Sequence, residues 1–397
     1  MRNKSRSKKN LAARKPVRAV VALMLLRPDG EMYYCTIVGT VSERCKVNIR
    51  ERILAAMYWN EPDQIPLTVY ETILPRGVNE RSLREKGVGL VYRPPAHQVE
   101  HREVEIMSRE YWEAGRRLIR RTIRTPVGDV WQTLEPDTTG YEGNTWIKEH
   151  FIKEPEDYRV MEYYIKDAVY HDNYDFLRET IRRIGGDGLV YVRVAKSPIQ
   201  EILYQMMGIE RFSLHLYDHP YLIDSLHAVM LERYEELFEL AAAAPVEILL
   251  LGDNITADMV GPDRFKKYLM PIYTRVKQHI AGTDKRLAVH MDGHLAALTN
   301  LIAETEIDII EALTPPPMGD LSIEEARIAW PEKALWINFT SSMHIASPDS
   351  IETHTRQLLK EAGGKRGFAV GVTEDAPPEA LERSLEIISK VIRGGPT

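Results

Sequence analysis

Residues 286–317 have the sequence RLAVHMDGHLAALTNLIAETEIDIIEALTPPP. The apolar stretch Leu287–Val289 predicts a β-strand that ends at His290 and Asp292, and a helix follows it. A second apolar strand ends at Glu311. In parallel α/β proteins the catalytic groups lie at the carboxyl ends of the strands. The stretch therefore predicts a site at which these three side chains meet.

The second half of the chain repeats a strand–helix unit. The predicted strands are Val246–Leu251, Leu287–His290, Ile307–Ala312, Ala334–Phe339 and Gly367–Val372. Short connections between such units are typical of a parallel sheet. Further strands near residues 67, 89 and 190 bring the number to eight, which favours an α/β fold of the (β/α)8 barrel type. An open doubly wound sheet is the alternative, but no strand is followed by the glycine-rich turn that binds phosphate in such sheets.

Two segments depart from this repeat. Residues 1–47 comprise a basic tail and a predicted β-hairpin with its turn at Arg27–Gly30. Residues 88–135 show alternating apolar and polar positions, which predict an excursion of β-ribbon, and Lys148–Ala168 is predicted as a helix. We therefore expect a barrel domain over residues 48–397, with an N-terminal extension and one β-ribbon excursion.

Charge and cysteine content limit the partners and the compartment. Residues 1–17 carry seven Lys or Arg and no acid, so the net charge of −6 leaves −13 for the remainder, which disfavours nucleic-acid binding. The tail and the apolar Ala19–Leu26 have the order of a secretory signal, but the stretch is short and lacks a small-residue cleavage site. No stretch approaches the roughly 20 apolar residues that span a membrane. Cys35 and Cys45 are the only cysteines, which excludes a disulfide framework and predicts a cytoplasmic location.

Ionisable side chains gather at the predicted carboxyl ends of the strands. The predicted catalytic residues are Asp253, His290 and Asp292, and the predicted metal ligands are His290, Asp292, Glu311 and Glu374. One imidazole nitrogen with several carboxylate oxygens suits Zn²⁺ or another divalent ion. A structural alternative stays open, in which His290 and Asp292 cap the following helix and Asp253 belongs to a turn.

Several short segments carry a resemblance to a known family. They are Asn48–Asp63 (NIRERILAAMYWNEPD), Leu251–Asp253, Gly261–Pro262, Tyr268–Pro271, His290–Gly293 and Val372–Glu379. In these segments, and over residues 48–395 as a whole, the chain resembles the uroporphyrinogen decarboxylase superfamily. The resemblance implies a (β/α)8 barrel and includes a branch of corrinoid-linked methyltransferases. Members that decarboxylate uroporphyrinogen carry an N-terminal motif similar to Met-Arg-Gln-Ala-Gly-Arg-Tyr that grips substrate carboxylates, and this chain has no such segment.

The methyltransferase branch binds zinc through a His-x-Cys pair, an acid about twenty positions later and a second Cys. His290 falls on the histidine of this pattern, Asp292 on the first cysteine, and Glu311 near the acid. Glu374 is the nearest side chain that could replace the second cysteine. The resemblance therefore implies an oxygen-rich zinc site, and such an ion is suited to polarising an ether or hydroxyl oxygen.

Three functions are consistent with these observations. The first is metal-assisted methyl transfer from a small O- or N-methylated donor to the corrinoid of a partner protein. The second is a metal-free decarboxylase in which Asp253 or Asp292 stabilises a protonated intermediate; Arg or Lys on the barrel rim would favour it, whereas the rim residues found in the sequence are mainly acidic. The third is a non-catalytic barrel that binds a corrinoid or another small ligand. Barrels of this kind often form homodimers, but nothing in the sequence indicates a dimer surface.

Overall fold

The computed structural model describes residues 21–26, 32–37, 47–74, 77–136 and 145–395. Contacts within the chain separate two units, Met1–Val47 and Asn48–Thr397. In the first unit, β1 (Val21–Leu26) and β2 (Met32–Ile37) form an antiparallel pair. The turn predicted at Arg27–Gly30 and the basic tail lie outside the described residues.

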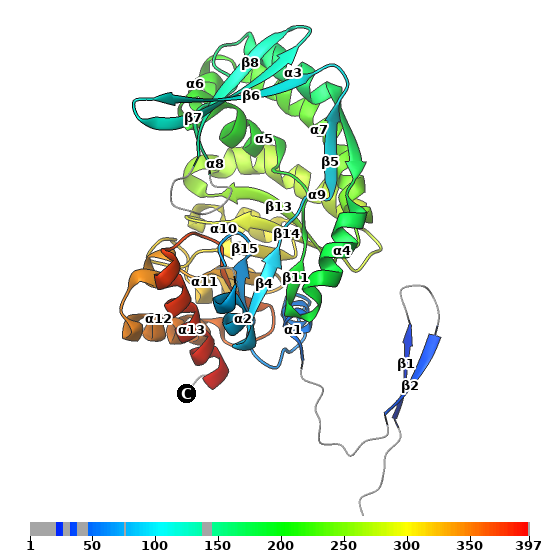
Figure 1. Cartoon of the computed structure of the whole chain (residues 1–397), viewed down its shortest axis with the longest axis vertical. Helices are drawn as coiled ribbons and strands as arrows, with labels where there is room; N and C mark the ends of the chain where they lie inside the picture. Colours follow the sequence, from blue (N-terminus) through cyan, green and yellow to red (C-terminus); the bar gives the residue numbers. More distant parts are fainter. Residues whose placement is uncertain (1–20, 27–31, 38–46, 75–76, 137–144, 396–397) are drawn as a thin grey trace, which may run out of the picture. The chain divides into compact units, whose positions relative to one another are not determined.

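Parallel strands close into a barrel in the second unit (Figure 1). They are β3 (Leu67–Tyr70), β4 (Val88–Tyr92), β11 (Gly188–Val190), β12 (Val192–Arg193), β13 (Ile248–Ile255), β14 (Arg286–Met291), β15 (Ile309–Leu313), β16 (Ala334–Asn338) and β17 (Phe368–Val372). β11 pairs with β4 and β12 pairs with β13, so these two pieces, separated by Tyr191, form one of the eight positions around the barrel. β17 pairs with β3 and closes the ring. The predicted (β/α)8 barrel is confirmed.

Helices follow the strands and cover the barrel. They are α1 (Ile49–Met57), α2 (Val78–Glu85), α4 (Tyr174–Ile184), α5 (Pro198–Glu201), α6 (Ile209–Asp218), α7 (Pro220–Ala243), α8 (Ala257–Arg264), α9 (Met270–His279), α10 (Thr299–Glu304), α11 (Ile323–Ala329), α12 (Pro348–Ala362) and α13 (Pro378–Gly394). Helix α8 is kinked at Gly261, whose φ is 64°, and Phe265–Leu269 forms a wider π turn between α8 and α9. Among the described residues, no helix is both long enough and apolar enough to cross a membrane.

The barrel strands are buried on both faces. Every residue of β15, β16 and β17 is buried, which explains why their sequences are continuous apolar runs without alternation. The covering helices instead bury one stripe. In α13 this stripe includes Leu381, Leu385, Ile388 and Ile392, at the spacing of one helical face.

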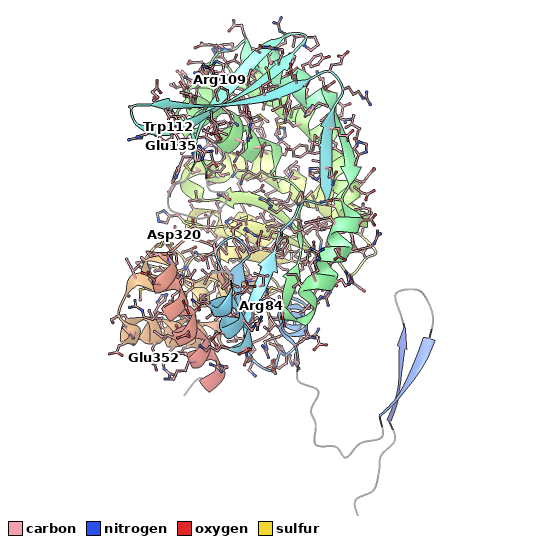
Figure 2. The ribbon with its side chains drawn as sticks, in the orientation of Figure 1. Arg84, Arg109, Trp112, Glu135, Asp320 and Glu352 are labelled. Atoms are coloured by element: carbon pink, nitrogen blue, oxygen red, sulfur yellow. The ribbon has the colours of Figure 1, made fainter. Side chains whose placement is uncertain are left out.

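The connection from β4 to β11 is expanded into a subdomain (Figure 1). It contains an antiparallel pair, β5 (His97–His101) with β10 (Ala168–Asp172), an antiparallel sheet of β6 (Glu105–Glu113), β7 (Arg116–Thr125), β8 (Gly128–Pro136) and β9 (Thr145–Glu149), and helix α3 (Asp157–Asp167). Figure 2 shows Arg109 and Trp112 on this sheet, far from Glu352 on α12. The helix predicted from Lys148 is wrong in its first part, because Lys148 belongs to β9. The pairing of β9 with β8 is a tertiary contact that periodicity does not reveal.

Gly188 permits the close approach of β11 to β4. It lies opposite Leu90 in the parallel register. A Cβ atom at this position would lie 2.0 Å from the carbonyl oxygen of Leu90. Both positions are buried, so the strands would have to separate to make room.

We expect Gly188→Ala to lower the free energy of unfolding by about 2 kcal/mol, the usual cost of forcing extra volume into a packed core. Gly394→Ala is the matched control, because a Cβ there meets nothing within 4 Å. Urea unfolding of both variants would measure the difference. Equal stability of the two variants would contradict the close approach.

Candidate active site

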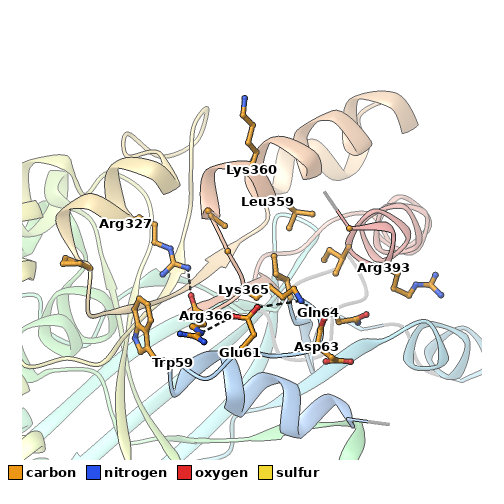
Figure 3. Close-up of a pocket in the computed structure, with 17 residues that line it drawn as sticks. Trp59, Glu61, Asp63, Gln64, Arg327, Leu359, Lys360, Lys365, Arg366 and Arg393 are labelled. Atoms are coloured by element: carbon orange, nitrogen blue, oxygen red, sulfur yellow. Dashed lines mark hydrogen bonds and ion pairs between the residues drawn. The ribbon is translucent and has the colours of Figure 1, made fainter. Parts of the chain in front are cut away.

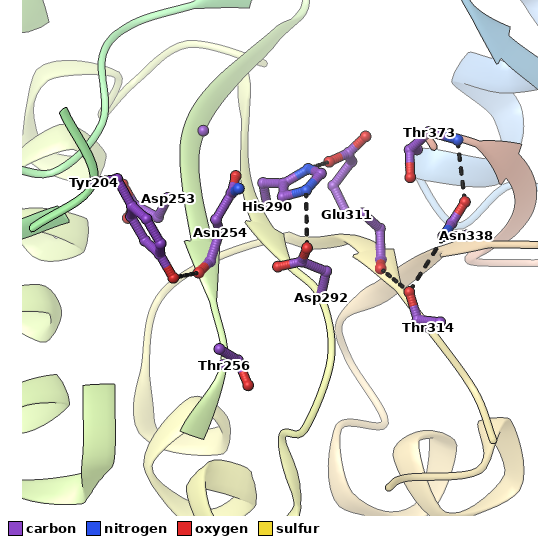
Figure 4. Close-up of polar contacts among 12 residues, drawn as sticks. Tyr204, Asp253, Asn254, Thr256, His290, Asp292, Glu311, Thr314, Asn338 and Thr373 are labelled. Carbon is purple, nitrogen blue, oxygen red and sulfur yellow. Dashed lines mark hydrogen bonds and ion pairs between the residues drawn. The ribbon is translucent and has the colours of Figure 1, made fainter. Parts of the chain in front are cut away.

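His290 and Glu311 face each other at the carboxyl ends of β14 and β15 (Figure 4). The two residues are direct partners in the parallel register of these strands. Nδ1 of His290 lies 2.6 Å from Oε2 of Glu311. The sequence predicted this meeting, and the geometry follows from register alone, since paired residues of adjacent parallel strands direct their side chains to the same face.

Two tyrosines complete the surroundings of Glu311. Tyr70, the last residue of β3, donates its hydroxyl to Oε1 of Glu311, and the hydroxyl of Tyr191 donates to the same oxygen at 3.2 Å. The carboxylate is 1% exposed. Burial raises the pKa of Glu311. The charge and hydrogen bond of His290, the hydrogen bond of Tyr70 and the charge of Arg93 outweigh burial, so the net pKa is lowered. The net effect keeps Glu311 ionised.

The surroundings of His290 favour its protonated form. Burial lowers the pKa of His290, but the charge of Glu311, its hydrogen bond and the charge of Asp292 outweigh burial and raise it. Nε2 of His290 lies 3.8 Å from Oδ2 of Asp292, so both ring nitrogens face carboxylates. Because Glu311 occupies Nδ1, Nε2 is the nitrogen that can donate a proton to a substrate.

Asp253 lies apart from this cluster. Its buried carboxylate accepts hydrogen bonds from the amide of Ser197 at 2.5 Å, from the Ser197 hydroxyl at 2.7 Å and from Tyr273 at 3.2 Å. The register of β13 is irregular between Leu251 and Ile255, a bulge that re-aims side chains at the rim. Asp253 therefore anchors the start of α5, and none of its recorded bonds in the described part of the chain reaches His290.

Glu374 is not part of the His290 cluster either. It is partly buried in the connection after β17, and within the described residues it has no recorded hydrogen bond or ion pair. Asn338 instead ties the neighbouring strand ends, because its Oδ1 accepts the amide of Thr373 at 3.1 Å (Figure 4).

The predicted metal shell is not gathered in this arrangement. No group of three or more His, Cys, Asp or Glu side chains among the described residues is placed to hold an ion. His290 and Glu311 are bonded to each other instead of facing a common point. A catalytic zinc ion takes three protein ligands around an open position, so these side chains as they lie do not fit one.

The rim also carries three cations that the sequence reasoning missed. Arg93 follows β4 directly and lies over the ring of Tyr70, with Cζ 3.1 Å from the ring centroid. Arg193 ends β12, and its side chain donates to the carbonyl of Arg93 at 3.0 Å. Lys196 donates to the carbonyl of Gly252 and exerts its charge on His290. These cations add positive charge to a rim that also carries the predicted acids Asp253, Asp292 and Glu311.

A cavity of about 950 Å³ (Figure 3) lies at the end of the barrel where the strands begin, opposite His290 and Glu311. It is formed by loops that precede β3, β16 and β17. Arg366 bonds Glu61 at 3.1 Å, and Arg327 donates to the carbonyl of Arg366 at 2.7 Å. These contacts fasten two loops together, and this end lies away from the strand ends that carry chemistry in such barrels.

We expect Glu311→Gln to lower the pKa of His290, because burial then acts without the opposing carboxylate charge. NMR titration of the labelled imidazole would measure the shift. The control is Glu352→Gln, on the outer helix α12, which should leave the His290 titration unchanged. Identical titrations in the wild type and Glu311→Gln would contradict the pairing.

Comparison with known proteins places the chain in a family. The segment 140–393, more than half of the chain, matches the model of the uroporphyrinogen decarboxylase (URO-D) family. A uroporphyrinogen decarboxylase of Streptomyces coelicolor is 26% identical over 133 residues, which are 32% of this chain and 36% of that protein, so only about a third of the relative's length is matched. A methyltransferase from Methanosarcina mazei is similar in fold, with a TM-score of 0.52 at 11% identity over 88% of this chain and 99% of that one. The chain belongs to the uroporphyrinogen decarboxylase family.

Proposed function

We propose that this protein is an enzyme that transfers a methyl group from a small O- or N-methylated donor to a corrinoid carried by a partner protein. The observation that carries the proposal is the His290–Glu311 pair, in which a buried carboxylate lies 2.6 Å from Nδ1 and raises the pKa of the imidazole. A positioned acid with a raised pKa is what a poor leaving group needs.

In the proposed reaction, a Co(I) corrinoid supplies the nucleophile for the methyl carbon. The bond from that carbon to the donor oxygen or nitrogen breaks, and the electron pair stays on the heteroatom. Nε2 of His290 gives its proton to the heteroatom, so an ether oxygen leaves as a neutral hydroxyl. Glu311 stays ionised throughout and fixes the orientation of the ring. The proposed reaction uses no metal ion, because no three described His, Cys, Asp or Glu side chains are placed to bind one.

Decarboxylation is the second candidate, favoured by the rim cations. Arg93, Arg193 and Lys196 are placed to attract an anionic substrate group. In that reaction the bond from carbon to the carboxylate breaks, carbon dioxide leaves, and the electron pair stays on carbon. His290 then protonates this carbon. The same acid serves both reactions, so substrate tests are required to separate them.

We expect the purified protein to convert a reduced Co(I) corrinoid to its methylated form with at least one compound of a panel of O- and N-methylated donors. His290→Ala should lower the rate about 10²- to 10⁴-fold, the usual contribution of a general acid. The rate should fall as pH rises through the pKa of His290, which must be protonated to act. His171→Ala, an exposed histidine on β10, is the control.

Absorbance of the corrinoid under anaerobic conditions gives the readout, and carbon dioxide release from carboxylated compounds is measured in parallel. Carbon dioxide release without methylation would support the second candidate. Absence of turnover in both assays would support the third function considered above, that of a non-catalytic ligand-binding barrel.

Elemental analysis tests the metal ion that the sequence predicts. We expect protein loaded with excess Zn²⁺ and then desalted to retain no equivalent that depends on His290 and Asp292, because the described residues do not gather three ligands. The comparison is with a His290→Ala, Asp292→Ala double variant. One equivalent of zinc that is present in the wild type and lost in the variant would support the metal-assisted reaction instead.

A further inference from the structure

A cavity of about 260 Å³ lies where the excursion meets the barrel helices. Its walls come from β5, β10 and α3 on one side and from α5 and α7 on the other. The residues that matter for its chemistry are His97, Tyr164, Tyr170, Lys196, Glu201 and Tyr234. A neighbouring hollow of about 370 Å³ shares Lys196 and Glu201, so the two spaces adjoin.

Glu201 is an unpartnered acid in this cavity. Its carboxyl has no recorded hydrogen bond or ion pair in the part of the chain that the structure describes, and the residue is partly buried in the lining of both cavities. Burial raises its pKa to about 7, against the lowering effect of Lys196. A buried polar group without a partner is costly to the fold, which favours a role toward a ligand.

Three tyrosines surround the same space. Tyr164, Tyr170 and Tyr234 line the cavity, and the charge of Glu201 acts on all three. None of their hydroxyls has a recorded hydrogen bond among the described residues. His101 stacks on one face of Tyr164, and the guanidinium of Arg233 lies over the ring of Tyr170. Aromatic faces attract cations, so the remaining ring surface beside this acid favours an alkylated ammonium group.

Lys196 does not neutralise this acid by a hydrogen bond. Its ammonium is directed to the carbonyl of Gly252 and, at 3.4 Å, to Oδ1 of Asn254. The charge of the same side chain also acts on Asp292, so Lys196 lies between the cavity and the His290 cluster. Glu201 therefore remains available to a cation that enters the cavity.

We propose that this cavity is a binding site for a small alkylammonium cation, with Glu201 as the counter-charge and the rings of Tyr164, Tyr170 and Tyr234 around the alkyl groups. The inference concerns binding and holds whether or not the barrel transfers methyl groups.

Calorimetry with choline and its uncharged isostere, 3,3-dimethylbutan-1-ol, tests the site on the full chain at pH 8. We expect choline to bind at least about tenfold more tightly, because the two probes differ in charge but not in shape. Glu201→Gln should remove this preference, whereas Glu239→Gln, an exposed acid on α7, should keep it. Equal affinity for both probes, or an unchanged preference in Glu201→Gln, would overturn the proposal.

Two further measurements guard against loss of folding in that variant. Tyr234→Phe should keep the affinity within about threefold, since the ring face remains, and Tyr234→Leu should weaken it about tenfold. In the wild type, affinity should fall as pH is lowered through about 7, where Glu201 takes up a proton. Burial lowers the pKa of His97, of His101 and of Lys196, and it raises that of Asp253 and of the three tyrosines. An affinity independent of pH would count against Glu201.

Discussion

The carboxylate of Glu311 is the group on which the rest of the site depends. It is buried near the barrel axis and accepts hydrogen bonds from His290 on β14, Tyr70 on β3 and Tyr191 between β11 and β12. An unpaired carboxylate in such a place costs several kcal/mol. Its donors come from three other positions around the ring, so the charge is satisfied only when the barrel is closed. Closure of the fold and assembly of the site are therefore one event.

The same carboxylate sets the chemistry of His290. A buried imidazole by itself favours the neutral form, and here the charge of Glu311 reverses that preference. Because the hydrogen bond consumes Nδ1, the proton available for reaction is on Nε2, beside Asp292. An acid fixed in this way can serve either a leaving oxygen or nitrogen or a carbanion. This explains how one barrel geometry is compatible with either methyl transfer or decarboxylation, and why the rim residues must decide between them.

The sequence predicted the barrel and the His290–Glu311 contact because both depend on local order. Apolar runs followed by helices mark the strands, and residues at the ends of consecutive parallel strands become neighbours. Tyr70 and Tyr191 escaped prediction because they come from strands distant in sequence, and tyrosine is common in strands for packing reasons alone. Asp253 was placed at the right strand end, but the bulge in β13 turns its carboxylate toward Ser197. Strand position is local information, whereas side-chain direction at a bulge is not.

Glu311, which is buried, and Glu201, which is partly buried, show how surroundings assign different roles to one residue type. Glu311 has three donors, and its pKa is lowered despite burial. Glu201 has no recorded donor among the described residues, and burial raises its pKa to about 7. A carboxylate whose bonds are all made within the protein can orient another side chain but has little capacity left for a ligand. A carboxylate without hydrogen bonds destabilises the folded protein when it is ionised, unless a cation binds beside it. The first therefore suits the proposed reaction centre, and the second suits the proposed cation site.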